Sequence, residues 1–111
     1  MAVTLKQIAL GSLSASSNFT TGDVGASKVQ VVRSIRLVNT HASNSITVNI
    51  SAGPTSGEKA VAPKDLSLGP GQAFVDDTEI VLKANDHLKV EAGSGGGPVH
   101  YVVSGFERDQ S

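Results

Sequence analysis

Hydrophobic and polar residues alternate with a period of two along much of the chain, the pattern of a β-strand that buries one face. Over residues 46–51, Ile, Val and Ile alternate with Thr, Asn and Ser, which predicts an antiparallel strand with one face in a core. Residues 88–92 and 99–103 repeat this pattern. Their alternation predicts inward positions for Leu88, Val90, Ala92, Val99, Tyr101 and Val103.

A longer strand is predicted over residues 28–39, where four aliphatic residues share one face. Arg33 interrupts that face, so we expect a bend or bulge there, or a strand that crosses between two sheets. Another strand is predicted over residues 3–10, with a phase slip at Lys6 and Gln7. The four aliphatic residues of the longer strand are Val29, Val31, Ile35 and Leu37.

Short polar segments rich in Gly, Pro, Asn and Ser separate the predicted strands, and these are turn-forming residues. No ten-residue stretch has convincing helical spacing, and Pro63 interrupts the nearest candidate, residues 57–68. The sequence therefore predicts an all-β fold, an antiparallel β-sandwich or jelly roll of about seven to eight strands. The connecting segments are residues 40–45, 69–72, 84–86 and 93–97.

Alternation also predicts a register for the last two strands. If residues 88–92 pair with residues 99–103, Glu91 lies opposite His100, and Lys89 lies opposite Val102. A slip of one residue would bury charged side chains, which is disfavoured because their desolvation is costly.

Composition divides the chain into an N-terminal strand and Ser/Gly/Thr-rich arm, residues 1–27, and a β-sandwich domain, residues 28–111. The stretch from residue 11 to residue 27 has few large apolar residues and no clear period. It is either an ordered surface loop or an arm that becomes ordered against a neighbouring subunit.

The composition narrows the classes of function. A chain of 111 residues has room for one domain, and its 39% hydrophobic and 17% charged residues do not suit a charge-driven disordered chain. A net charge of −1 without a basic stripe makes duplex nucleic acid a poor partner. The absence of cysteine excludes disulfides and thiolate chemistry. We expect no membrane span and no signal peptide, because no apolar run approaches 20 residues and the N-terminus lacks a basic stretch.

Candidate catalytic and metal-binding residues are few. The three histidines, His41, His87 and His100, are spread over a loop and two predicted strands, so a solvated strand face explains them better than a catalytic or metal site. The densest acidic cluster lacks the spacing of a calcium loop, and strand-end polarity explains it better. It consists of Asp76, Asp77 and Glu79.

Two further motifs suggest no chemistry. The glycine run of residues 93–97 is followed by a predicted strand, whereas a phosphate-binding loop precedes a helix. Serine is plentiful, but no Gly-x-Ser-x-Gly motif occurs. The sequence therefore predicts no enzyme, no cofactor and no resident metal.

Three segments together resemble small all-β structural proteins of tailed bacteriophages, which decorate or cement capsids or sit at the neck and tail. They are VRSIRLVNT (32–40) followed by ITVNI (46–50), LGPGQ (68–72) leading into IVLKANDHLKV (80–90), and VHYVVSGFE (99–107). The resemblance covers about residues 28–107.

The resemblance implies a non-enzymatic virion protein on the capsid surface that binds the major capsid protein. It also implies a homo-oligomer, most often a trimer. We hypothesise that residues 2–27 contact the shell or a neighbouring subunit, through the apolar residues Leu5, Ile8, Leu10, Leu13 and Phe19.

Two alternatives stay open at this stage. One is a neck or tail ring component of the same kind of virion, which copy number would distinguish from a decoration protein. The other is a carbohydrate- or receptor-binding β-sandwich, which predicts an exposed aromatic platform or an acidic cation site.

Overall fold

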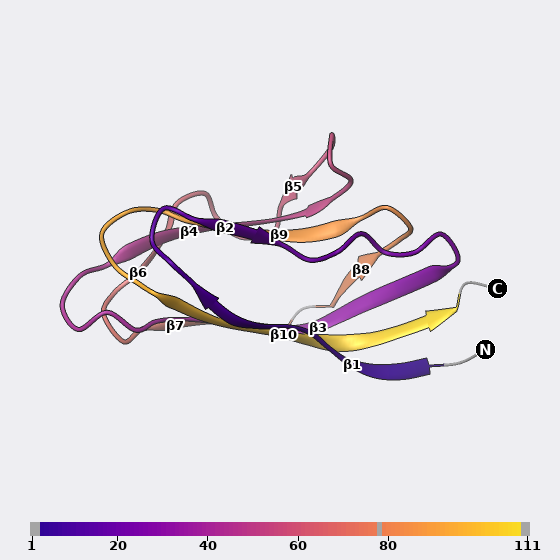
Figure 1. The fold of residues 1–111 in the computed structure, drawn as a ribbon, viewed down its shortest axis with the longest axis horizontal. Helices are drawn as coiled ribbons and strands as arrows, with labels where there is room; N and C mark the ends of the chain where they lie inside the picture. The colour runs from indigo at the N-terminus through magenta and orange to yellow at the C-terminus, as the bar shows by residue number, and fades with distance from the viewer. Residues whose placement is uncertain (1–2, 78, 110–111) are drawn as a thin grey trace.

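The chain folds into two antiparallel β-sheets that lie one above the other (Figure 1). The computed structural model describes the backbone of residues 3–77 and 79–109, with side chains from residue 7 onward. The described strands are β1 (Val3–Leu13), β2 (Asn18–Thr20), β3 (Lys28–Asn39), β4 (Ile46–Gly53), β5 (Lys59–Ala60), β6 (Leu66–Leu68), β7 (Ala73–Asp76), β8 (Ile80–Leu82), β9 (His87–Ala92) and β10 (Val99–Asp109).

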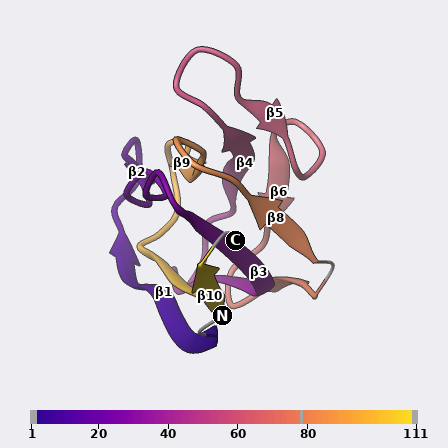
Figure 2. The same cartoon turned by 90° about the vertical axis from the view of Figure 1, so that its right-hand side faces the viewer.

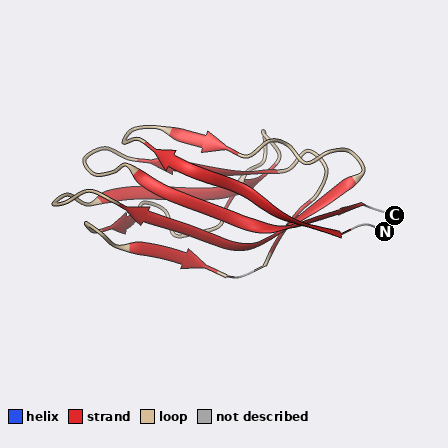
Figure 3. Ribbon diagram, turned by 60° about the horizontal axis from the view of Figure 1, so that its bottom comes forward, coloured by secondary structure: helices blue, strands red, loops and turns tan. Residues whose placement is uncertain are grey.

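Each sheet has five strands among the described residues. Sheet A has the order β1-β10-β3-β7, and β8 also pairs with β3. Sheet B has the order β2-β9-β4-β5, and β6 also pairs with β4. Figure 3 shows strands and loops only, so the predicted all-β sandwich is confirmed. The structure has more strands than expected because β2, β5 and β6 are pairings of two or three residues that alternation does not reveal.

The core lies between the inner faces of the two sheets and is almost entirely aliphatic. The inward positions predicted from alternation in β4, β9 and β10 are buried, and Tyr101 packs half-buried against the core. In β3 the predicted single face is wrong: the bulge at Arg33 shifts the alternation, so Ile35 and Leu37 face the core together with Val32, whereas Val29 and Val31 lie on the outer face. Ile46, Val48 and Ile50 are each at most 1% exposed. The fully buried apolar side chains are Val32, Ile35, Leu37, Ile46, Val48, Ile50, Leu82, Leu88, Val90, Val99 and Val103.

The expected irregularity at Arg33 is a β-bulge. Ser34 pairs with Ser104 and Val32 pairs with Gly105, which leaves Arg33 without an opposite residue on β10. The bulge brings the β3 backbone so close to Gly105 that an added Cβ there would lie 1.9 Å from the Val31 carbonyl oxygen. Glycine is therefore the residue that this close approach requires. In β1 the register slips at Ile8, one residue after the predicted position.

The predicted pairing of residues 88–92 with residues 99–103 is wrong. β9 pairs with β2 and β4 in sheet B, whereas β10 pairs with β1 and β3 in sheet A. Consequently Glu91 lies opposite Asn18 and Asn49, and not opposite His100. The glycine-rich connection crosses from one sheet to the other, and alternation fixes which face is buried without fixing which strand is the neighbour.

Residues 3–20 contribute one strand to each sheet. β1 pairs along its length with β10 and forms an edge of sheet A, and β2 pairs with β9 at an edge of sheet B. Across the sandwich, the Phe19 ring stacks on Tyr101 with a centroid separation of 4.1 Å and an angle of 13°. Gly11 lies beside this stack, where an added Cβ would be 2.8 Å from the Tyr101 hydroxyl oxygen.

A buried asparagine, Asn39, holds three connections together at the end of β3. Its Nδ2 donates to the carbonyl oxygens of Asn44, Leu68 and Gly69 at 2.9, 3.0 and 3.2 Å. Its Oδ1 accepts from the amides of His41 and Gly97, both at 3.0 Å. One side chain thus connects the loop after β3, the turn after β6 and the glycine-rich crossover before β10.

Candidate interaction surface

The outer face of sheet B is polar. Because Leu88, Val90 and Ala92 point inward, the intervening residues of β9 point outward, and the same parity holds for β4. A shallow hollow on this side is lined by polar and apolar residues together, namely Asn49, Ile50, Ser51, Ala60, Ala62, Lys64 and Glu91. Sheet B therefore has the ordinary sandwich pattern, with apolar residues inside and polar residues in contact with water.

The outer face of sheet A is different, because it carries large exposed apolar side chains. Leu10, Val75, Val81 and Val102 are 62%, 50%, 54% and 38% exposed, and none of them belongs to the core or packs against it. Each alternates with an inward residue on its own strand, so all four lie on the outer face. They are the exposed large hydrophobic side chains of the described residues.

Three of these residues belong to one row that crosses the whole sheet. Leu10 pairs with Val102, Val102 with Arg36, and Arg36 with Val75. Residues directly opposite on neighbouring strands have side chains about 5 Å apart on the same face. We call this line of four residues the distal row. At the β1 end of this row, Leu10 and Val102 also line a shallow hollow.

A second apolar row crosses the same face nearer the chain ends. Phe106 pairs with Val31, and Val31 pairs with Val81, and we call these three residues the proximal row. Val31 is 5% exposed in the middle of the row and lies outside the main core cluster. Between the two rows lies the small polar pair Ser104 and Ser34. The outer face thus has two apolar rows separated by serines.

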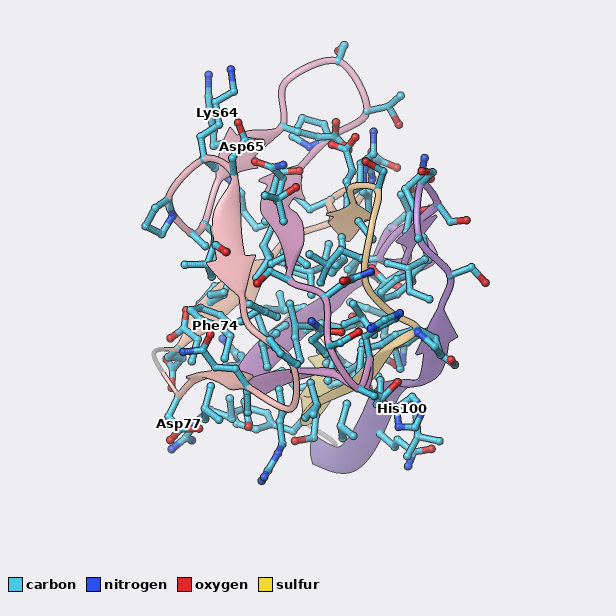
Figure 4. The ribbon with its side chains drawn as sticks, turned by 90° about the vertical axis from the view of Figure 1, so that its left-hand side faces the viewer. Lys64, Asp65, Phe74, Asp77 and His100 are labelled. Atoms are coloured by element: carbon cyan, nitrogen blue, oxygen red, sulfur yellow. The ribbon has the colours of Figure 1, made fainter. Side chains whose placement is uncertain are left out.

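Two arginines of this outer face lie in or beside the apolar rows. Arg36 lies in the distal row and is exposed, and Arg108 lies next to the proximal row, opposite Val29. At the bulge, the exposed Arg33 is 3.7 Å from a carboxylate oxygen of Glu79. In the end-on view of Figure 4, His100 and Asp77 lie far apart across the width of sheet A, and Lys64 and Asp65 lie beside sheet B.

The five apolar residues that we expected to contact a partner differ in their surroundings. Leu13 is 5% exposed and belongs to the core, while Ile8 and Phe19 are half-buried and pack against it. Leu10 is exposed on the outer face of sheet A. The Cα of Leu5 pairs with that of Phe106, and its side chain lies outside the described part of the chain.

The three histidines do not converge. His41 lies in the loop after β3, where its Nδ1 accepts from the amides of Ser43 and Asn44 at 3.1 and 2.9 Å. His100 is exposed on β10. His87 is buried, with Nε2 hydrogen-bonded to Glu58 and Nδ1 3.3 Å from an oxygen of Asp23.

This placement gives His87 a structural explanation. The two carboxylates come from different connections, the one between β2 and β3 and the one between β4 and β5. His87 therefore joins both loops to the end of β9. Among the residues that the structure describes, no three or more His, Asp or Glu side chains are grouped to hold a metal ion.

The predicted acidic cluster is spread along the edge of sheet A. Asp76 is the last residue of β7 and is half-buried, whereas Asp77 and Glu79 are exposed. A separate ion pair joins Lys28 to Asp109 near the chain ends, and its hydrogen bond raises the pKa of the Lys28 ammonium. The described residues contain no helix long and apolar enough to cross a membrane.

Sequence reasoning missed Val75 and Val81 as surface residues, and it placed Val102 opposite a residue of the other sheet. A signal was present, because β8 reads Ile-Val-Leu and β10 contains adjacent Val102 and Val103. Consecutive apolar residues in a strand place apolar side chains on both of its faces.

Comparisons with known proteins identify a fold and no family. No family model matches the chain, and no curated protein matches its sequence. Among solved structures, the Drosophila NLP-core, which was studied for pentamer formation and histone binding, superposes with a TM-score of 0.54 at 20% identity. That match covers 91% of this chain and 98% of the NLP-core chain.

Proteins of a viral particle share the fold as well. The T13 particle of infectious bursal disease virus gives a TM-score of 0.54 at 14% identity, and the VP2 subviral particle gives 0.52 at 12%. Both matches cover 96% of this chain, but only 30% and 32% of the viral chains. The chain thus spans about a third of those proteins and shares the β-sandwich of one portion of them.

Proposed function

We propose that this chain is a non-enzymatic structural protein of a virus particle, where it binds and stabilises the capsid shell as a decoration or cement protein. The observation that carries the proposal is the apolar outer face of sheet A. A contiguous apolar surface on a soluble sandwich is typical of a protein–protein contact. The fold shared with viral particle proteins and the resemblance of residues 28–107 to phage structural proteins support the same proposal.

The partners in this proposal are the major capsid protein and further copies of the chain, with a trimer as the assembly that the resemblance implies. Burial of apolar surface contributes about 25 cal/mol per Å², from which the cost of association must be subtracted. Many copies on a closed shell turn a modest contact into strong reinforcement. The shell-contacting segment remains residues 2–27, in which Leu10 is the exposed side chain among those predicted.

A carbohydrate-binding module is less well supported. Sugar binding by such a sandwich needs an exposed aromatic platform, and the four aromatic side chains are all half-buried in the described structure. Two of them, Phe19 and Tyr101, stack on each other inside the sandwich.

The test is quantitative peptide mass spectrometry on purified particles from the source organism, with copies counted per major capsid subunit. A decoration protein is expected in hundreds of copies, in proportion to the shell. Six or twelve copies would replace decoration with a neck or tail ring. Absence from the particles would overturn the virion proposal.

A further inference from the structure

We propose that the outer face of sheet A binds the same face of a second copy of this chain around a two-fold axis that runs across the strands over Ser34 and Ser104. This inference rests on the self-association in the proposed function and specifies it: a two-fold dimer replaces the trimer that the resemblance implies, and the outer face of sheet A contacts a second copy and not the shell.

The row pattern is self-complementary about that axis. In an isologous contact, residue i of one copy contacts residue j of the other and j contacts i, and only residues on the axis meet their own copies. With the axis over the serines, the distal row of one copy lies on the proximal row of the other. Val102 then faces Phe106, and Val75 faces Val81, so apolar side chains meet apolar side chains at both ends.

The serines suit the centre of this contact. Ser34 and Ser104 pair with each other in the middle of sheet A. Among the residues of β3 and β10 that point to the outer face, they have the smallest side chains. Because the side chains between the two apolar rows are small, the apolar rows of the two copies can approach each other closely. Face-to-face sheets typically pack about 10 Å apart with interdigitating side chains.

The charges are compatible with the same geometry. Arg36 lies two residues from the serine row, so the two Arg36 residues of a dimer would be separated by about 14 Å along the strands. Each Arg36 instead lies over Val31 of the other copy, with its aliphatic stem on apolar surface.

The face is also large enough. The sheets are stacked along the intermediate axis in Figure 1, so the face extends about 36–40 Å along the strands β3 and β10, which have 12 and 11 residues, and up to 19 Å across them. That extent is comparable with the roughly 800 Å² per partner that stable interfaces bury. Viewed from the end in Figure 2, sheet A forms the lower layer, and its outer surface is not covered by the loop of β5.

The first experiment measures the mass of the purified full chain by sedimentation and light scattering over a range of concentrations. A dimer is expected, and Val102→Glu should weaken its association at least about a hundredfold, because it places a carboxylate against the apolar Phe106 of the other copy. Thr20→Glu is the matched control, since it adds the same charge at an exposed position of β2 in sheet B. Circular dichroism verifies that each variant is folded.

The second experiment tests the axis and uses the absence of cysteine in the chain. With a short bismaleimide, Ser104→Cys should cross-link to itself, whereas Val75→Cys should cross-link efficiently only when mixed with Val81→Cys. A monomer at all concentrations, a trimer, association unaffected by Val102→Glu, or efficient linkage of Val75→Cys to itself would each overturn the proposal. These outcomes are independent of whether the chain occurs in virus particles.

Discussion

Asn39 is the position where a single polar side chain should matter most for stability. Asn39→Ala removes a group that is 0% exposed and that hydrogen-bonds five backbone groups of three connections. Two of these bonds, to the Leu68 carbonyl and from the Gly97 amide, are buried from water. The other three involve groups that solvent reaches more easily.

The magnitude follows from the two buried partners. A buried donor or acceptor left without a hydrogen bond costs about 1–3 kcal/mol, so two of them predict a loss of about 2–6 kcal/mol. That is a large share of the roughly 5–15 kcal/mol that stabilises a typical domain. Asn39→Asp should be at least as damaging at neutral pH, because it replaces the donating amide with an oxygen that faces three carbonyl oxygens.

The assay is urea unfolding followed by far-UV circular dichroism, because the chain has no tryptophan to report by fluorescence. Asn18→Ala is the control, since Asn18 is exposed on β2, and it should change the free energy of unfolding by less than about 0.5 kcal/mol. If both Asn39 variants lost less than about 1 kcal/mol at an unchanged denaturant slope, the crossover would be held by something other than this side chain.

Three further predictions concern stability. Gly105→Ala should lower the free energy of unfolding by about 3 kcal/mol or prevent folding, because its Cβ would lie 1.9 Å from a β3 carbonyl oxygen. Gly22→Ala is the control and should be neutral, because nothing lies within 4 Å of the added Cβ, and urea unfolding midpoints compare the two variants. A double-mutant cycle of Phe19→Leu and Tyr101→Leu should give a coupling of about 0.5–1.5 kcal/mol, and additivity would refute the stack. The hydrogen bond to Asp109 raises the pKa of Lys28 above its ordinary 10.5. The pair therefore stabilises the fold below pH 10.5, and this stabilisation is lost as the pH rises through the folded pKa. Thermal melts of Lys28→Met should lack this loss of stability at alkaline pH.

Alternation predicted burial well because it depends only on the backbone pleat. The inward positions of β4 and β9 and the irregularity at Arg33 were all visible in the order of apolar and polar residues. Which strands pair with each other was not visible in this order. The connection over residues 93–98 has the composition of a hairpin loop, but it crosses between the sheets.

The buried polar groups were also beyond sequence reasoning. Asn39 continues a strand whose alternating positions are otherwise apolar, and its five hydrogen bonds come from segments as distant as Gly97. His87 has its carboxylate partners on two loops, at Asp23 and Glu58. Such contacts depend on how loops meet at the ends of the sandwich, which no local pattern encodes.

The adjacent residues Val102 and Val103 lie on opposite faces of sheet A, and their side chains need different explanations. Val103 is fully buried and stabilises the sandwich of a single chain, so a valine there is explained by folding alone. Val102 is 38% exposed, and burial in the core gives no reason to prefer valine over the polar residues that occupy the same side of sheet B. The same contrast holds along the distal row, from Leu10 to Val75. An outer face that is apolar on one sheet and polar on the other is therefore best explained by a contact that only sheet A makes.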